Sequence, residues 1–179
     1  YKMFHVLFGG IKGGLAIGTM FMMVAISAMN GLSVAGMAIG ATIALPEMLK
    51  RNYDKRMITG VVQAGSSLGI LIPPSVVMVL YGMIARQPVS KLWMAGILPG
   101  LLMASLFLIY IYVRCKLQPE LGPPLKKEER EVSTVEKIRL LKAGIIPFLI
   151  FFFMTGLFLM GIASLVECSA VGAFLATLA

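Results

Sequence analysis

Long uncharged stretches alternate with short polar ones along this chain. The uncharged stretches cover 13–46, 57–85, 92–113 and 143–166. A helix needs roughly 20 apolar residues to cross the hydrocarbon core of a membrane. The stretches have the length of helices and lack the short alternating segments of barrel strands. The pattern therefore predicts an all-α membrane protein.

The first uncharged stretch, 13–46, has 34 residues. One straight helix of that length would measure roughly 50 Å, against a core of about 30 Å. The run Asn30-Gly31-Leu32-Ser33 lies in its middle, and Asn-Gly is a strong turn signal. Because basic residues, Lys12 and Lys50, flank both ends, both ends are expected on the same side. We predict a re-entrant helical hairpin over 13–48 with its tip near the bilayer midplane; two short, tilted spans are the alternative.

The second stretch, 57–85, has 29 residues and contains many helix breakers. Its centre reads Gly65-Ser66-Ser67-Leu68-Gly69-Ile70-Leu71-Ile72-Pro73-Pro74-Ser75. Glycines weaken a helix, and prolines remove N–H donors and clash with the preceding turn. In lipid such a break is tolerated only where it is buried in protein or lines a polar cavity. We expect non-helical peptide over 66–74, which in a secondary transporter indicates a midplane binding site; a proline kink without a ligand is the alternative.

An unwound helix presents backbone carbonyls and hydroxyls, which suit a hard cation such as Na⁺. The hairpin tip offers the same groups, so we expect the two elements to face each other and form part of a Na⁺ site. The candidate residues, partly acting through their backbone, are Asn30, Gly31, Ser33, Gly65, Ser66, Ser67, Gly69 and Pro73. The sequence shows no phosphate-binding loop, metal-ligand cluster or nucleophile–base pair. We therefore expect no enzyme and no cofactor, with energy coming from an ion gradient or another chain.

Basic residues set the expected orientation, since they favour the cytoplasmic side. The expected segments are an interfacial helix end over 1–12, a cytoplasmic loop over 49–56, a broken transmembrane helix over 57–85, a transmembrane helix over 92–113, a cytoplasmic linker with a short helix over 114–142, a transmembrane helix over 143–166 and the start of another helix over 167–179. Glu167 either caps that last helix or serves a cation or proton.

Composition agrees with a multi-pass membrane protein. Hydrophobic residues make up 59% of the chain and charged residues 13%; the mean hydropathy is +0.92. The net charge of +8 is concentrated in the loops, so it does not indicate nucleic-acid binding. Because the chain begins with tyrosine, we expect it to be a piece of a longer protein.

Several distinctive runs occur along the chain. They are Gly31-Leu-Ser-Val-Ala, Leu45-Pro-Glu-Met, Tyr53-Asp-Lys, Gly69-Ile-Leu-Ile-Pro-Pro-Ser and Ala95-Gly-Ile-Leu-Pro-Gly. Together these motifs resemble the large membrane subunit of the tripartite ATP-independent periplasmic (TRAP) transporters. The resemblance covers nearly the whole chain and implies an N-terminal-half fragment, one repeat of an inverted-repeat, elevator-type transporter. It also implies that the region 30–33 and the region 65–73 contribute to Na⁺ binding.

The resemblance further implies a function and partners. It points to Na⁺-coupled import of organic acids, carboxylates above all, across the bacterial inner membrane. The implied partners are a periplasmic substrate-binding protein and a small membrane subunit. The alternatives are an ion-coupled carrier that works without a binding protein, a channel subunit and a membrane scaffold. The sequence leaves the individual substrate open.

Overall fold

The structure, a computed structural model, describes residues 11–123 and 149–178. These residues form helices joined by turns, with no strand among them, which confirms the all-α class. The chain divides into two compact units, Tyr1–Val132 and Ser133–Ala179, and each is described by itself. The expected interfacial end lies almost wholly outside the described residues, as do most of the expected linker and the beginning of the span expected over 143–166.

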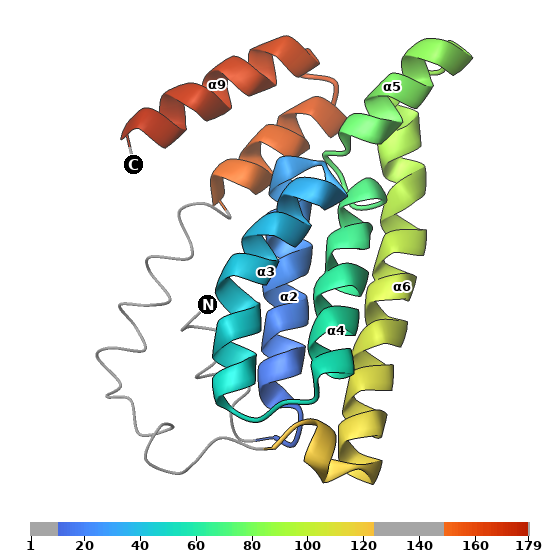
Figure 1. Cartoon of the computed structure of the whole chain (residues 1–179). Helices are drawn as coiled ribbons and strands as arrows, with labels where there is room; N and C mark the ends of the chain where they lie inside the picture. The colour runs from blue at the N-terminus through green and yellow to red at the C-terminus, as the bar shows by residue number, and fades with distance from the viewer. Residues whose placement is uncertain (1–10, 124–148, 179) are drawn as a thin grey trace. The chain divides into compact units, whose positions relative to one another are not determined.

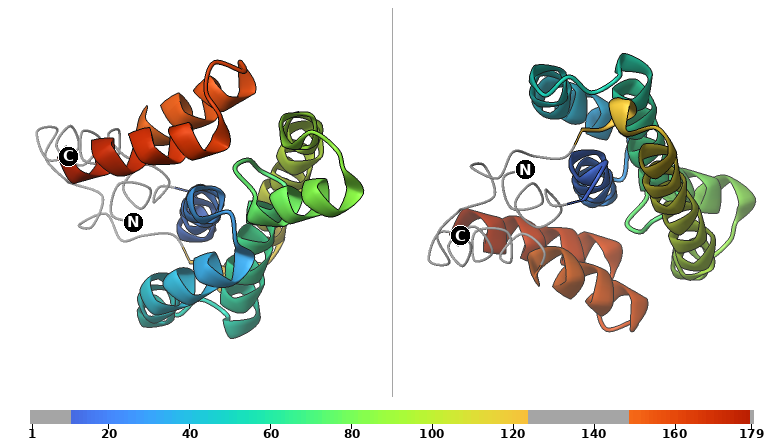
Figure 2. Two further views of the ribbon diagram at one scale, coloured as in Figure 1. Left: turned by 90° about the horizontal axis from the view of Figure 1, so that it is seen from above. Right: turned by 90° about the horizontal axis from the view of Figure 1, so that it is seen from below.

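Five α-helices and two 3₁₀ turns make up the described part of the first unit. Its elements are α2 (Gly14–Asn30), α3 (Ser33–Lys50), α4 (Lys55–Ser67), the 3₁₀ turn η1 (Leu68–Ile70), α5 (Val76–Ala85), α6 (Val89–Leu117) and the 3₁₀ turn η2 (Pro119–Leu121). Helices α2, α3 and α4 pack against one another, and α6 contacts α2 and α5 (Figures 1 and 2). Within 11–123 and 149–178, α6 alone is long and apolar enough to cross a membrane.

The predicted hairpin is formed by α2 and α3. Its turn is at Gly31, whose φ of 64° is left-handed, as the Asn-Gly signal requires. The arms have 17 and 18 residues, or about 26 Å each at 1.5 Å per residue. Each arm is thus slightly shorter than a hydrocarbon core of about 30 Å. The re-entrant position of the hairpin stays a prediction.

The loop expected over 49–56 is shorter in the structure, where only 51–54 is non-helical. The amides of Arg51 and Tyr53 both donate to the carbonyl of Met48, which reverses the chain within four residues. Asp54 then caps α4, because its carboxylate accepts hydrogen bonds from the amides of Arg56 and Met57 at 2.9 and 3.2 Å. Because of this cap, α4 begins at Lys55, two residues before the apolar stretch 57–85 from which the helix was predicted.

The predicted break between α4 and α5 is present, but it begins later than expected. Ser66 and Ser67 belong to the last turn of α4, where their hydroxyls donate to carbonyls of the same helix. Non-helical residues then run from Leu71 to Ser75, after η1. The helix has to stop in this region because the ring of Pro73 would clash with the carbonyl four residues earlier.

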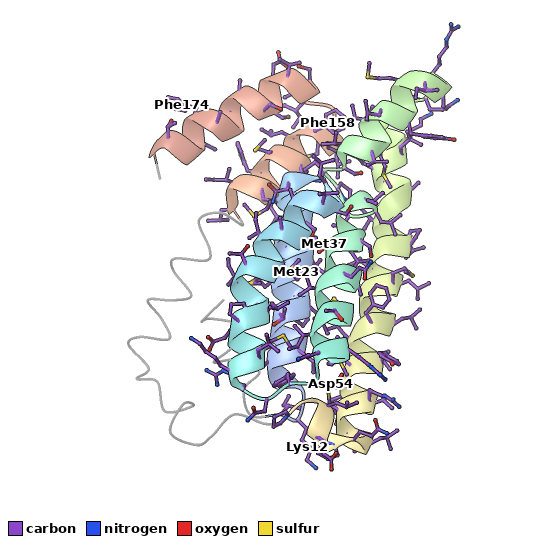
Figure 3. The ribbon with its side chains drawn as sticks, viewed as in Figure 1. Lys12, Met23, Met37, Asp54, Phe158 and Phe174 are labelled. Atoms are coloured by element: carbon purple, nitrogen blue, oxygen red, sulfur yellow. The ribbon has the colours of Figure 1, made fainter. Side chains whose placement is uncertain are left out.

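Helix α6 exceeds the span expected over 92–113, beginning at Val89 and continuing to Leu117. The chain then folds back under the bundle. The amide of Gly13 donates to the carbonyl of Gly122 at 2.9 Å, and the amide of Asp54 donates to the carbonyl of Leu121 at 3.3 Å. These bonds bring the start of α2, the start of α4 and the end of α6 together at one end of the unit (Figure 3).

Small residues allow the helices of the bundle to approach closely. A Cβ atom built on Gly65 of α4 would lie 2.5 Å from the Cβ atom of Met23, and one built on Gly40 of α3 would overlap the sulfur of the same methionine. Met23 is fully buried among α2, α3 and α4 (Figure 3). Close packing through small residues is how helices associate in lipid, where burial of apolar surface gives no driving force.

The second unit contains a helix over Leu149–Leu159 and α9 (Leu165–Leu178). The span expected over 143–166 therefore ends at 159. Gly161, at φ 71°, forms a Schellman cap, with its amide bound to Phe158 and that of Ile162 to Leu157.

Glu167 lies in the first turn of α9, which begins two residues earlier than expected. Its carboxylate accepts hydrogen bonds from the amide and the hydroxyl of Ser164 at 2.7 and 2.8 Å. The amide of Glu167 in turn donates to the hydroxyl of Ser164 at 3.3 Å. This reciprocal pair is a capping box, so Glu167 has the capping role, one of the two roles the sequence left open.

Two alanine substitutions on α4 test the close packing of the bundle. Gly65→Ala should leave the protein less stable than Gly60→Ala by about 1–3 kcal/mol, because only the first puts a methyl group into occupied space. A Cβ atom on Gly60 would meet nothing within 4 Å. Thermal unfolding of the full-length protein in detergent measures the difference. Equal stability of the two variants would contradict the packing described above.

Candidate functional site

The tip of the α2–α3 hairpin touches the break between α4 and α5. The carbonyl of Gly31 accepts a hydrogen bond from the amide of Val76 at 3.1 Å. A Cβ atom on Gly31 would lie 2.7 Å from the carbonyl oxygen of Pro74 and 3.1 Å from the nitrogen of Val76. The tip therefore rests backbone against backbone on the non-helical segment, and a residue with a side chain would not fit at this position.

A second contact buries the hydroxyl of Ser27, on the last turn of α2. A Cβ atom on Gly69 would lie 2.7 Å from both the Cβ atom and the carbonyl oxygen of Ser27, and one on Gly36 would overlap its Oγ atom. Ser27 is 0% exposed, and its hydroxyl has no hydrogen-bond partner among the described residues. Since an unsatisfied buried hydroxyl costs about 1–3 kcal/mol, this position is suited to a bound partner.

The break also leaves backbone oxygens uncommitted. The amides of Leu71 and Ile72 both donate to the carbonyl of Leu68, at 3.0 and 2.8 Å. Pro73 and Pro74 have no N–H to donate. From Leu71 to Pro74, no carbonyl accepts a backbone hydrogen bond from the residues that the structure describes. The segment is thus rich in free acceptors and poor in donors, which is a suitable environment for a cation.

The start of α5 is anchored from two sides. The hydroxyl of Ser75 caps the helix by accepting a hydrogen bond from the amide of Met78 at 3.3 Å. The carbonyl of Ser75 accepts a hydrogen bond from the indole N–H of buried Trp93 on α6, also at 3.3 Å. The bond to Trp93 holds the end of the break against α6. The hydrogen bond from the amide of Val76 to Gly31 holds it against the hairpin tip.

Three of the residues predicted for the site lie at or within the contact of hairpin and break, by backbone rather than side chain. Gly31 and Gly69 lie at the contacts between hairpin and break, and Pro73 is buried within the break. Gly65 lies one turn earlier on α4 and packs against Met23.

The predicted side-chain ligands are placed differently. Ser66 is buried and its hydroxyl donates to the carbonyl of Val62 at 2.5 Å, whereas Ser67 is exposed and bonds to the carbonyl of Ala64. Asn30 is exposed, and its amide group donates to the carbonyl of Ile26 at 2.8 Å. Ser33 is half-buried at the first turn of α3. Unlike the hydroxyl of Ser27, the hydroxyl or amide group of each of these four residues is either exposed to some degree or hydrogen-bonded.

Sequence reasoning missed Ser27. It lies three residues before the Asn-Gly turn, inside the uncharged stretch 13–46, whose pattern predicts the arms of a hairpin. The available signal was a hydroxyl in an apolar helix one turn from the predicted tip, with a glycine at 36 in the facing arm. That signal is weak because serine hydroxyls in such helices commonly bond to their own backbone.

A family model described as "Tripartite ATP-independent periplasmic transporter, DctM component" matches residues 1–179. The chain is 37% identical over 110 residues to the C4-dicarboxylate TRAP transporter large permease protein DctM of Pseudomonas aeruginosa, covering 62% of the chain and 26% of that relative.

Two further relatives carry other substrate names. The chain is 38% identical over 106 residues to the ectoine/5-hydroxyectoine TRAP transporter large permease protein UehC of Ruegeria pomeroyi, covering 59% of the chain and 24% of the relative. It is 34% identical over 106 residues to the isethionate TRAP transporter permease protein DctMQ of Oleidesulfovibrio alaskensis, covering 59% and 17%. The chain thus matches about a quarter or less of the length of these relatives.

An alanine at position 31 tests the contact between hairpin tip and break. Gly31→Ala should speed hydrogen exchange at the amide of Val76, because the added methyl group would push the tip off the break. Gly161→Ala is the control, since Gly161 also has a positive φ but nothing within 4 Å of its Cβ position. Both variants pay the left-handed penalty of about 1–2 kcal/mol. Unchanged exchange at Val76 in Gly31→Ala would contradict the contact.

Proposed function

The chain belongs to the DctM family, the large permease component of the tripartite ATP-independent periplasmic transporters, and from that premise we propose that it is part of a Na⁺-coupled importer of organic acids. In this proposal it acts in the bacterial inner membrane as a multi-pass subunit. A small membrane subunit and a periplasmic substrate-binding protein complete the transporter. Relatives named for C4-dicarboxylates and isethionate favour small organic anions as the substrate class.

One observation carries the proposal: Ser27, whose buried hydroxyl has no partner among the described residues, packs against Gly69 of η1, the turn that leads directly into the segment of uncommitted backbone carbonyls. Hard cations take oxygen ligands, including backbone carbonyls. Neutral oxygens from an unwound helix are the usual ligands of Na⁺ in secondary transporters. We therefore propose that Na⁺ binds between the hairpin tip and the break, with Ser27 as a ligand added to the candidates predicted from the sequence.

The exposed polar side of α4 favours a role in transport over a purely structural role. Its amphipathic pattern leaves Thr59, Gln63 and Ser67 exposed on one side of the first unit. Polar side chains at membrane depth generally face protein or water rather than lipid. This side of α4 would then face the remainder of the permease or a water-filled path. In the elevator mechanism that we propose, hairpin, break and α4 move together because glycine contacts hold them close.

Uptake into proteoliposomes tests the function as a whole. The full-length permease and its small subunit are reconstituted, and uptake of C4-dicarboxylates is measured with and without a Na⁺ gradient and a binding protein. The proposal requires both for uptake. Uptake without the binding protein would favour an independent carrier, gradient-insensitive flux would favour a channel, and a complete lack of uptake would favour a scaffold.

Substitution of Ser27 tests the ion site separately from transport. A ligand that binds only the folded state at a hundred times its Kd stabilises a protein by about 2.7 kcal/mol. Wild-type permease should therefore unfold at a higher temperature in Na⁺ than in K⁺, and Ser27→Ala should lose most of this difference. Stability in K⁺ should hardly fall, because the hydroxyl has no hydrogen bond to lose in the structure.

Ser105→Ala is the matched control. It removes the same atom from α6, where the hydroxyl donates to the carbonyl of Leu101 at 2.8 Å, and it should keep the full Na⁺ effect. A Ser27→Ala permease that responds to Na⁺ as the wild type does would rule out Ser27 as a ligand.

A further inference from the structure

A groove of about 770 Å³ runs between α4 and α6, away from the contact of hairpin and break. This volume falls within the roughly 300–1,000 Å³ that is usual for small-ligand sites. Apolar side chains form most of its walls, among them Met57, Val61, Leu106, Phe107 and Ile111. One end is closed by η2, since Leu121 also lines the groove and its carbonyl binds the amide of Asp54.

Two arginines lie at the groove, one from each helix. Arg56 belongs to the first turn of α4 and Arg114 to the last turn of α6, and both are exposed. Neither forms an ion pair with another described residue. Asp54 also lines the groove, but an oxygen of its carboxylate already accepts two hydrogen bonds from the start of α4. Two guanidinium groups therefore remain available to an anion.

Other basic residues cluster at the same end of the unit. They are Lys12, Lys50, Lys55 and Lys116 (Lys12 and Asp54 are labelled in Figure 3). The opposite end of α6 carries Arg86 and Lys91 in the turn before it and at its start. The excess of positive charge marks the groove end as the cytoplasmic side, which faces anionic lipids.

We propose that the groove binds an anionic phospholipid, with an acyl chain against the apolar walls and the phosphate group on Arg56 and Arg114. Basic pockets between transmembrane helices on the cytoplasmic side bind anionic lipid headgroups. The same site would suit a small organic acid poorly, since such a substrate has no long apolar chain to cover the walls. Bound lipid would tie the start of α4 to the end of α6 independently of Na⁺ coupling.

Lipid binding is measured by native mass spectrometry of the full-length permease in detergent, with phosphatidylglycerol and phosphatidylcholine as probes. The wild type should bind phosphatidylglycerol in preference. The double variant Arg56→Gln/Arg114→Gln should weaken that binding about 30-fold, at the contribution expected of two basic side chains near an anionic surface. Gly60→Leu should weaken the binding of phosphatidylglycerol as well, because Gly60 lines the groove and has open space at its Cβ position.

The matched control is Arg86→Gln/Lys91→Gln, which removes the same charge from the opposite end and should leave binding unchanged. Equal binding of both lipids by the wild type, or unchanged binding in Arg56→Gln/Arg114→Gln, would overturn the proposal. A Gly60→Leu permease that unfolds more easily but binds phosphatidylglycerol as the wild type does would also overturn it. That result would mean that a segment of the longer chain, and not a lipid, fills the groove. The readout is independent of uptake, so its failure would leave the Na⁺ site and the transport proposal standing.

Discussion

The need of every peptide group for a partner governs this structure. Lipid offers no hydrogen bonds, so a chain that leaves the helix at membrane depth has to be covered by other protein or by water. Between α4 and α5 the chain does leave the helix, and the α2–α3 hairpin covers it. The hydrogen bond between Gly31 and Val76 joins the two non-helical segments at the point where each would otherwise be open.

Close approach makes this cover possible and explains the pattern of glycines around it. Positions 31, 36 and 69 have no room for a Cβ atom, because backbone or a serine side chain already occupies that space. Methionines 20 and 23 of α2 are buried and pack against Gly65 of α4, and their unbranched side chains adapt to an irregular surface. The outcome is a tightly packed region that still contains one buried hydroxyl and several carbonyls without partners within 11–123 and 149–178. The proposed Na⁺ site rests on this combination of tight packing and free polar atoms, which a simple helix kink does not require.

Helix α4 connects the two regions on which the proposals rest. Its last turn leads into the break and the hairpin tip, whereas its first turn lies beside the end of α6 and the basic residues there. The Asp54 cap sets where the helix begins, and the prolines set where it has to end. A displacement of α4 along its axis would therefore move residues both at the break and at the groove beside the end of α6.

The sequence by itself determined the all-α class, the hairpin turn at Asn30-Gly31 and the presence of a break before Pro73. These features depend on single residues acting on their own backbone: glycine permits a left-handed turn, and proline forbids the continuation of a helix. The tertiary structure decided which polar atoms remain free. Ser66 and Ser67 stay helical and Glu167 forms a cap, whereas the Ser27 hydroxyl finds no partner in the described part of the chain because α3 and η1 close over it. The partners of Ser66, Ser67 and Glu167 are local, three or four residues away. The surroundings of Ser27 are formed by elements that meet it from other parts of the chain, and local sequence does not specify that meeting.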